Sequence, residues 1–369
     1  MGLVKGFKRD RGAGSGEQGA GSREQEAGSR EAGNRVPIPG ARPPQPLAPA
    51  TGGAYGAPLE VEDVAEPLRK PPWFKINRLA VGERASGVLQ AIARNQLHTV
   101  CTSAACPNKG ACFAEGTATF MILGDVCTRA CRFCNIATGR PDLEDLEEPR
   151  RLADAAAKMG LRFVVVTSVC RDDLADEGAG AFASSIRALR DQIPGVKVEV
   201  LTPDFSGRED CLRTVLSAGP HVFNHNLETV ERLTPRVRTK AKYNRSLSVL
   251  RMVRELEPSL PTKSGLMVGL GETREEMRQA FRDLAGVGIE RLTIGQYLQP
   301  TRLHHPVVRF YDLDEFAQMR EEAREAGIAA VLSGPLVRSS YHAGEFVASG
   351  QGEKAESREV KQGSKEVRK

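Results

Sequence analysis

Cysteine placement constrains this chain more than any other feature of its sequence. The chain has 369 residues and eight cysteines, and six of the cysteines fall between residues 101 and 134. A disulfide framework would require an oxidising compartment, and the N-terminus has no apolar stretch typical of a secretory signal. In a reducing compartment, clustered cysteines are typically ligands of metals or of iron–sulfur clusters. We therefore expect the cysteines to carry the chemistry of this protein.

One group of cysteines is a C-x3-C-x2-C triplet formed by Cys127, Cys131 and Cys134. It closely follows an apolar run, residues 117–124, which we predict to be a strand. Three thiolates can hold three irons of a [4Fe–4S] cube, which leaves the fourth iron open to a substrate or cofactor. A zinc knuckle with a distant fourth ligand is the alternative, although zinc sites usually show paired C-x2-C or C-x4-C spacings.

A second group of cysteines precedes the first and has the spacing C-x4-C-x5-C, formed by Cys101, Cys106 and Cys112. It also offers three thiolates with no evident fourth cysteine. A structural [4Fe–4S] site is normally held by four cysteines. Either another residue completes this site, or the cluster in it is labile.

Composition excludes several functional classes. A net charge of +5 with 5% aromatic residues gives no support to a nucleic-acid-binding protein. No apolar run of about 18 residues is present, so we expect no membrane span. With 40% hydrophobic and 27% charged residues, the chain has enough apolar material for a sizeable core.

The two ends of the chain cannot contribute to that core. Residues 1–57 contain a degenerate repeat of Gly, Ala, Ser, Glu and Arg followed by a Pro-rich run, and we predict that this arm is disordered. A mitochondrial transit peptide is the alternative for the arm, but such peptides are poor in acidic residues and the arm contains several. Residues 349–369 have no apolar periodicity and are predicted to be a disordered tail.

Between these ends, strand-like and helix-like segments alternate. Apolar, β-branched segments predict strands at residues 117–124, 162–169, 196–203, 221–226, 263–271, 291–298 and 329–334. Helical patterns lie between them, for example at residues 148–160, 179–193 and 273–288. Buried strands that alternate with helices predict a parallel sheet, and about six such units fit an α/β fold of the partial (β/α)6 TIM-barrel type. In such a barrel the chemistry lies at the carboxyl ends of the strands.

The triplet at residues 127–134 resembles the signature of the radical S-adenosylmethionine (SAM) superfamily. Residues 223–228 and the glycine-rich residues 265–272 are similar to cofactor-binding motifs of the same superfamily. The resemblance implies that SAM chelates the open iron, and that the reduced cluster cleaves SAM to a 5′-deoxyadenosyl radical. It also implies SAM contacts at Phe133, Asn226, Glu228, Gly265 and Gly269.

Two further features make the resemblance more specific. The spacing C-x4-C-x5-C is typical of lipoyl synthases, and residues 338–341, Arg-Ser-Ser-Tyr, resemble a motif of that family. The resemblance implies that Ser340, with Ser339 as the less favoured neighbour, supplies the fourth ligand of an auxiliary [4Fe–4S] cluster. It divides the folded part into an extension that binds the auxiliary cluster (58–115), a radical SAM barrel (116–335) and a C-terminal segment that closes over that cluster (336–348).

The activity implied by the resemblance is a sulfurtransferase reaction at two unactivated carbons. Two sulfur atoms would enter at C6 and C8 of an octanoyl chain on a carrier lysine, and the auxiliary cluster would be consumed as their source. The implied partners are octanoylated lipoyl domains of 2-oxoacid dehydrogenase E2 subunits or glycine cleavage H protein, a ferredoxin- or flavodoxin-type reductant, and an iron–sulfur carrier for cluster repair. We expect a cytoplasmic setting and no membrane or nucleic-acid partner.

Two other functional classes stay open at this point. One is a different two-cluster radical SAM enzyme that inserts sulfur or methylthiolates its substrate. The other is a zinc-stabilised binding protein.

Several further residues receive no catalytic role. Lipoyl synthases usually have an aspartate where this chain has Cys170, so no carboxylate role is assigned there. Cys170 and Cys211 are predicted to be small core residues. No histidine is predicted to be a catalytic residue. The basic run at residues 236–245 is predicted to be a solvated face, with attraction of an acidic carrier domain as the alternative.

Overall fold

The computed structural model describes residues 68–74, 83–104, 106–114, 118–341 and 343–344. The predicted N-terminal arm and C-terminal tail lie outside the described residues, as do parts of the predicted segments 58–115 and 336–348. No helix in the described part of the chain is long and apolar enough to cross a membrane.

One sheet organises the described residues, with the strand order β1-β2-β5-β6-β7-β8-β9-β10. Seven of its strands are parallel, and β1 runs antiparallel to β2 at one edge. The strands are β1 (His98–Thr99), β2 (Thr119–Ile122), β5 (Phe163–Ser168), β6 (Lys197–Leu201), β7 (Val222–Asn224), β8 (Thr262–Val268), β9 (Arg291–Gln296) and β10 (Ala330–Gly334). Two short strands, β3 (Val126–Cys127) and β4 (Ala137–Thr138), pair with each other separately.

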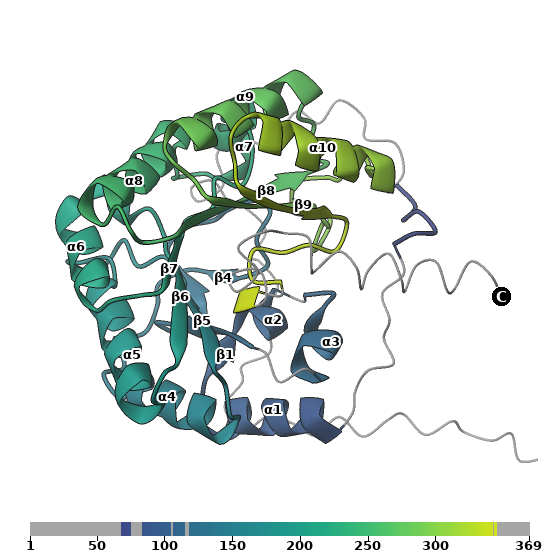
Figure 1. Ribbon diagram of the computed structural model, residues 1–369. Coiled ribbons are helices and arrows are strands. Elements are labelled where there is room, and N and C mark those ends of the chain that lie inside the picture. Colours follow the sequence, from purple (N-terminus) through teal and green to yellow (C-terminus); the bar gives the residue numbers. More distant parts are fainter. Residues whose placement is uncertain (1–67, 75–82, 105, 115–117, 342, 345–369) are drawn as a thin grey trace, which may run out of the picture. The chain divides into compact units, whose positions relative to one another are not determined.

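Helices connect consecutive parallel strands and lie along the outer side of the sheet (Figure 1). They are α4 (Glu148–Lys158), α5 (Ala179–Gln192), α6 (Glu209–Ser217), α8 (Tyr243–Leu256), α9 (Arg274–Gly286) and α10 (Leu313–Glu325). Six strand–helix units therefore run from β2 to α10, and β10 follows them. This order confirms the predicted partial (β/α)6 barrel, and each predicted strand overlaps a strand of the sheet, although β8 begins one residue before the predicted segment, at Thr262.

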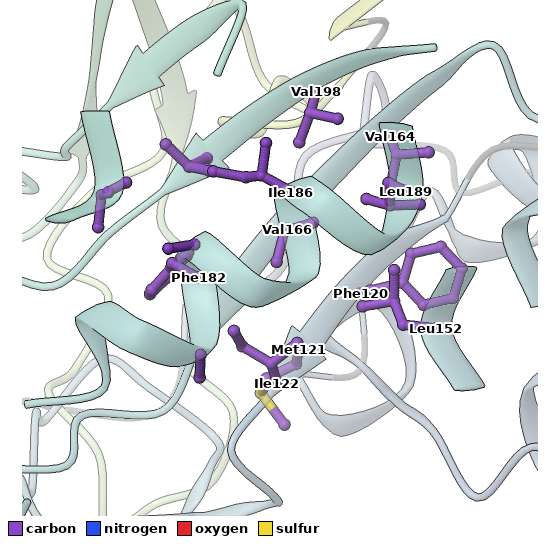
Figure 2. Packing of buried hydrophobic residues seen from close by; sticks show 14 of the residues in the cluster. Phe120, Met121, Ile122, Leu152, Val164, Val166, Phe182, Ile186, Leu189 and Val198 are labelled. Atoms are coloured by element: carbon purple, nitrogen blue, oxygen red, sulfur yellow. The ribbon is translucent and has the colours of Figure 1, made fainter. Parts of the chain in front are cut away.

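Apolar side chains on one stripe of each helix join the helices to the sheet. In α5, Phe182, Ile186 and Leu189 follow the helical period and are completely buried. They face Val166 of β5 and Val198 of β6, which are also completely buried (Figure 2). Because both faces of these strands are covered, the strands read as continuous apolar runs in the sequence.

Side-chain caps define where α9 and α10 begin. At α9, Thr273 accepts a hydrogen bond from the backbone of Glu276, and the Glu276 side chain accepts one from the backbone of Thr273. Asp312 and Glu315 form the same reciprocal arrangement at α10. Each capping box satisfies backbone N–H groups that the first helical turn leaves without partners.

The N-terminal extension continues the sheet at its β2 edge. It contains α1 (Glu83–Arg94), β1, α2 (Val100–Ser103) and α3 (Lys109–Ala114). Helix α1 contacts both α3 and α4, and α2 contacts β2. This packing brings the cysteines of the extension next to the first parallel strand.

A layer of buried polar side chains lies on the inner face of three neighbouring strands, β6, β7 and β8. Lys263 of β8 and Glu199 of β6 form an ion pair of 3.0 Å, and neither side chain is exposed. Asn224 of β7 donates a hydrogen bond of 3.0 Å to the same carboxylate. Along β6 and β8, the next residues on this face are Leu201 and Gly265, which line the cavity described below. The ionic layer thus lies one step from the cavity, toward the amino ends of the strands.

Candidate active site

A cavity of about 570 Å³ contains nearly all the residues that the sequence singles out. It lies at the carboxyl ends of the parallel strands, and residues from β2, β5, β6, β8 and β9 contribute to its wall. All six clustered cysteines line it: Cys101, Cys106, Cys112, Cys127, Cys131 and Cys134. No disulfide links any of the eight cysteines. Two triplets that are separate in the sequence therefore face a common space.

The triplet at residues 127–134 begins at the last residue of β3 and continues into the loop before β4. The Cys127 sulfur accepts backbone hydrogen bonds from Arg129 (3.4 Å) and Cys170 (3.3 Å). A side-chain hydrogen bond with Cys170, together with these backbone bonds, lowers the pKa of Cys127 to about 6 against the effect of burial. Burial raises the pKa of Cys131 to about 11 and the pKa of Cys134 to about 12.

A buried ion-pair network centred on Arg129 fixes this loop. The Arg129 guanidinium lies 2.6 Å from a carboxylate oxygen of Asp172 and 2.7 Å from one of Asp204. The Asp204 side chain is completely buried and also pairs with Arg245 at 3.4 Å. Hydrogen bonding and charge from Arg129 lower the pKa of Asp172 and of Asp204, although burial opposes this. The network joins the loop to the segments that follow β5 and β6.

Backbone contacts to more distant segments hold the same loop. The Arg132 N–H donates to the carbonyl of Val237 (2.9 Å), and the His305 N–H donates to the carbonyl of Arg132 (2.8 Å). The His304 ring nitrogen Nε2 lies 3.0 Å from the Cys134 carbonyl oxygen. Both histidines are buried and contact the loop.

The triplet at residues 101–112 is divided between two short helices. Cys101 lies in α2, whose N-terminus is capped by Thr99, and Cys112 lies in α3. The Cys106 N–H donates to the Cys101 carbonyl (3.2 Å), which bends the chain between the helices. Burial raises the pKa of Cys101.

A turn near the C-terminus reaches this second triplet. Asn108, which lies between Cys106 and Cys112, donates a hydrogen bond of 2.7 Å to the Leu336 carbonyl. Arg338, Ser339 and Ser340 of the turn all line the cavity, so the structure brings the predicted serine ligand and its neighbour into the same space as the cysteines.

A glycine on β9 makes room for that turn. A Cβ atom added to Gly295 would lie 2.1 Å from the Val337 carbonyl oxygen, which is closer than real contacts allow. The backbone of the turn therefore packs directly on the backbone of β9.

Four of the five residues predicted to contact SAM line the cavity: Phe133, Asn226, Glu228 and Gly265. The Asn226 amide donates to Glu228 (3.0 Å), while its buried Oδ1 atom has no hydrogen-bond partner in the described structure. Glu228 has a left-handed backbone conformation (φ 69°), and burial raises its pKa. A Cβ at Gly265 would lie 2.8 Å from Asn226 Oδ1, so a larger residue would displace the Asn226 side chain. An unpaired acceptor beside a strained carboxyl residue suits a polar cofactor.

Gly269 lies away from these four residues and does not line the cavity. It occupies the turn after β8 with φ 96°, and an added Cβ would lie 2.1 Å from the Gln296 amide nitrogen. The Glu272 carboxylate accepts hydrogen bonds from the N–H groups of Gly269 (2.6 Å) and Leu270 (2.9 Å). The second glycine and the glutamate of the predicted motif thus build the turn.

The prediction of two small core cysteines is confirmed for one of them. Cys211 is buried in the apolar core between α5, α6 and the sheet. Cys170 instead lines the cavity beside Cys127, so its assignment to the core is wrong. The run of apolar residues that ends at Val169 gave no signal that the next side chain turns into the site.

The basic run at residues 236–245 contains both exposed and buried side chains. Arg236, Lys240 and Lys242 are exposed, as expected for a solvated face. Arg238 is buried, lines the cavity and donates hydrogen bonds of 3.0 Å to the Leu227 carbonyl and to the Ser246 hydroxyl. The sequence analysis also did not single out Arg129. Its partners Asp172 and Asp204 are distant in the chain, and no local pattern marks them.

The donor set fits iron–sulfur clusters. Thiolates are the usual protein ligands of [4Fe–4S] cubes, and here two groups of three thiols line one cavity. Among the described residues, no three His, Cys, Asp or Glu side chains gather around a point as ligands of a single metal ion would.

Comparisons with known proteins agree with the geometry. The model of the radical SAM superfamily matches residues 121–284. A lipoyl synthase of Rubrobacter xylanophilus is 52% identical over 301 residues, which cover 82% of this chain and 94% of that protein. A lipoyl synthase of Methylococcus capsulatus is 54% identical over 292 residues, or 79% of this chain and 90% of that protein. A lipoyl synthase of Bacillus subtilis is 51% identical over 283 residues, or 76% and 95%.

Proposed function

The chain belongs to the lipoyl synthase family of radical SAM enzymes, and we propose on this premise that its two cysteine triplets hold two clusters of different use. As a member of that family it is a radical SAM sulfurtransferase, which uses SAM and two [4Fe–4S] clusters to convert a protein-bound octanoyl group into a lipoyl group. The observation that carries the proposal is the meeting of both triplets and the Arg-Ser-Ser-Tyr turn at one cavity.

The first cluster is held by Cys127, Cys131 and Cys134, and SAM binds beside it. Three thiolates leave one iron open, which suits chelation by the amino acid part of SAM. Phe133, Asn226, Glu228 and Gly265 contact SAM in this proposal, and the unpaired Asn226 oxygen supports a polar contact there. Gly269 acts through the shape of the turn after β8.

The auxiliary cluster is held by Cys101, Cys106, Cys112 and Ser340. The hydrogen bond from Asn108 to Leu336 supports this assignment, because it ties the cysteine segment to the turn that carries the serine. A serine oxygen matches iron less well than a thiolate does, so this ligand is the one that is lost most easily. Ser339 is the neighbour that the same turn offers as the alternative ligand.

The bound clusters and SAM together supply a radical that abstracts hydrogen from an unactivated carbon and a sulfide that bonds to that carbon. The protein holds the acyl chain between the two cysteine groups. Apolar side chains of the cavity wall, among them Met121, Val169 and Leu201, can contact the methylene groups and keep water away. The cavity of about 570 Å³ has the size of an ordinary small-molecule site.

The proposed partners follow from this chemistry. The carriers are octanoylated lipoyl domains of E2 subunits or the glycine cleavage H protein. A ferredoxin- or flavodoxin-type protein is the proposed reductant, and an iron–sulfur carrier restores the consumed cluster. A reducing, cytoplasmic setting keeps the cysteines available for iron.

An anaerobic assay with a carrier peptide tests the proposal. Reconstituted full-length protein, SAM and dithionite are mixed with an octanoyl-lysine peptide, and the peptide is analysed by mass spectrometry. We expect a gain of two sulfur atoms with loss of hydrogen. An unchanged peptide with accumulating 5′-deoxyadenosine would assign the chain to another radical reaction. A colourless protein that binds zinc in place of iron would support the binding-protein alternative.

Two variants separate the roles of the triplets. Cys106→Ala should still cleave SAM but yield no thiolated product, whereas Cys131→Ala should lose both activities. Dithiolated product from Cys106→Ala would contradict the role of the auxiliary cluster as sulfur source.

A further inference from the structure

An arginine in the cavity lacks an anionic partner. The Arg338 guanidinium lines the cavity, and its Nη1 atom donates to the carbonyl oxygens of Val337 (2.6 Å) and Pro335 (3.5 Å) in its own turn. Among the described residues, no carboxylate lies within ion-pair distance of it. A guanidinium has five N–H donors, and the two carbonyls engage only one nitrogen.

The Arg338 side chain is only half-exposed, so the lack of an anionic partner has an energetic cost. A buried charge is normally paired or hydrogen-bonded, because transfer of an unpaired charge out of water is strongly unfavourable. Arg129, a buried cation of the same cavity, has the carboxylates of Asp172 and Asp204 as partners.

The turn cannot move Arg338 away from the cavity without breaking its own packing. Its backbone lies against β9 at Gly295, where an added Cβ would also approach the Arg338 Nη1 atom to 3.3 Å. The Asn108 hydrogen bond to Leu336 holds the other side of the turn. The guanidinium is therefore placed in advance for an anion that the described chain does not itself provide.

The second cysteine triplet faces the same cavity as Arg338. Asn108, which lies between Cys106 and Cys112, is hydrogen-bonded to Leu336, two residues before Arg338. A cluster held by this triplet would bring negatively charged sulfur atoms into the space that Arg338 faces.

We propose that Arg338 is the counter-charge of the auxiliary cluster and donates hydrogen bonds to its sulfur atoms. This inference rests on the proposed function, because it requires a cluster at the second triplet. Hydrogen bonds and nearby charge stabilise thiolate-ligated clusters and set their reduction potentials. Arg338 shares a turn with Ser340, so the guanidinium keeps its hold on the cluster when the weaker serine ligand leaves.

Paired variants of Arg338 test the charge directly. Arg338→Gln keeps hydrogen-bond donors but removes the charge, whereas Arg338→Lys keeps the charge with different donors. The reconstituted full-length proteins are analysed for iron and acid-labile sulfide, and iron release to a chelator is followed under anaerobic conditions. We expect Arg338→Gln to release the iron of its auxiliary cluster at least tenfold faster than the unchanged protein, and Arg338→Lys to stay within threefold of it.

The first cluster serves as the internal control for folding. Four irons and the electron paramagnetic resonance signal of the reduced first cluster should persist in both variants. Equal release rates for Arg338→Gln and the unchanged protein would overturn the inference, and so would equally fast release from both variants. If the unchanged protein itself holds only one cluster, the proposed function fails together with the inference.

Discussion

The two cysteine triplets face one cavity but are held by different kinds of structure. The loop at residues 127–134 is fixed by the buried charges around Arg129 and by backbone bonds to segments near residues 170, 237 and 305. The segment at residues 101–112 is fixed by neutral hydrogen bonds. Among them, the bond from Asn108 to Leu336 joins the residues that are farthest apart in the sequence. Among the described residues, no ion pair joins this segment to the rest of the fold.

This difference matches the different fates proposed for the clusters. A cluster that serves in every turnover benefits from a site that keeps its geometry. A cluster that gives up sulfur and is rebuilt benefits from a site that can open at small energetic cost. We infer that the loop with the buried ion pairs holds the cluster that stays bound. The segment with neutral hydrogen bonds holds the cluster that is consumed and rebuilt.

The largest effect should come from loss of the charge at the centre of the rigid site. Arg129→Ala leaves Asp204 buried with only the more distant Arg245 as partner. Removal of one partner from a buried ion pair typically destabilises a protein by about 3–5 kcal/mol. Denaturant unfolding of the cluster-free chain measures this change, and iron analysis should show loss of the first cluster.

An exposed arginine provides the control for Arg129→Ala. Arg150 pairs with Glu147 and Asp154 on the surface of α4, and its side chain is 65% exposed. Arg150→Ala should leave the unfolding free energy almost unchanged, because exposed ion pairs contribute little. Similar losses for both variants would refute the special role of the buried network.

A pH effect should come from His225, which lies on the cavity wall. Its ring contacts the Thr202 carbonyl and the Ser246 hydroxyl, each at 2.9 Å. Burial lowers the pKa of His225 from 6.5 to about 4, with Arg238 and Arg129 adding to the shift and Asp204 opposing it.

The unfolded chain therefore binds a proton on His225 between about pH 6.5 and 4 while the folded chain does not. The free energy of unfolding therefore falls as the pH drops through that window. The contribution of His225 to this fall is on the order of 3 kcal/mol. His225→Asn cannot titrate, so its unfolding free energy should approach that of the unchanged protein as the pH falls. Parallel pH curves for the two proteins would contradict the assignment.

A smaller effect is expected where the C-terminal turn meets β9. Gly295→Ala brings a methyl group against the Val337 carbonyl, and such overpacking typically destabilises by about 1–3 kcal/mol. The matched control is Gly87→Ala in α1, where an added Cβ meets nothing within 4 Å. That change should instead stabilise by about 0.4–1 kcal/mol. Thermal unfolding shows whether each variant is more or less stable than the unchanged protein. A change in the same direction for both variants would contradict the close packing of the turn.

The smallest effect on global stability should come from the tie between the cysteine segment and the turn. Asn108→Ala removes one hydrogen bond and leaves the Leu336 carbonyl unpaired, which corresponds to about 1 kcal/mol. Iron release from the auxiliary cluster should nevertheless accelerate, because the tie is local to that site. Asn95→Ala, which removes a 2.7 Å bond to the Ala91 carbonyl of α1, should leave iron release unchanged.

Much of this fold could be predicted because its strands are buried on both sides. Runs such as residues 163–168 and 197–201 are rich in β-branched residues, and the helices between them show one apolar stripe each. The cysteines could be assigned to a common type of chemistry because their spacings are local patterns.

The supports of the site could not be predicted in the same way. Arg129 meets Asp172 and Asp204, which lie 43 and 75 residues later in the chain. The need for glycine at position 295 depends on a backbone segment that arrives 42 residues later, at Val337. Contacts of this kind arise from the winding of the barrel and leave no periodic or local pattern in the sequence.

The buried pair of Lys263 and Glu199 has a consequence for the register of the sheet. Glu199, Asn224 and Lys263 lie on the neighbouring strands β6, β7 and β8, and the Glu199 carboxylate accepts hydrogen bonds from both of the other side chains. A slip of one of these strands past the next would separate two desolvated charges. The strand ends that carry Leu201 and Gly265 into the cavity wall are therefore kept at one height.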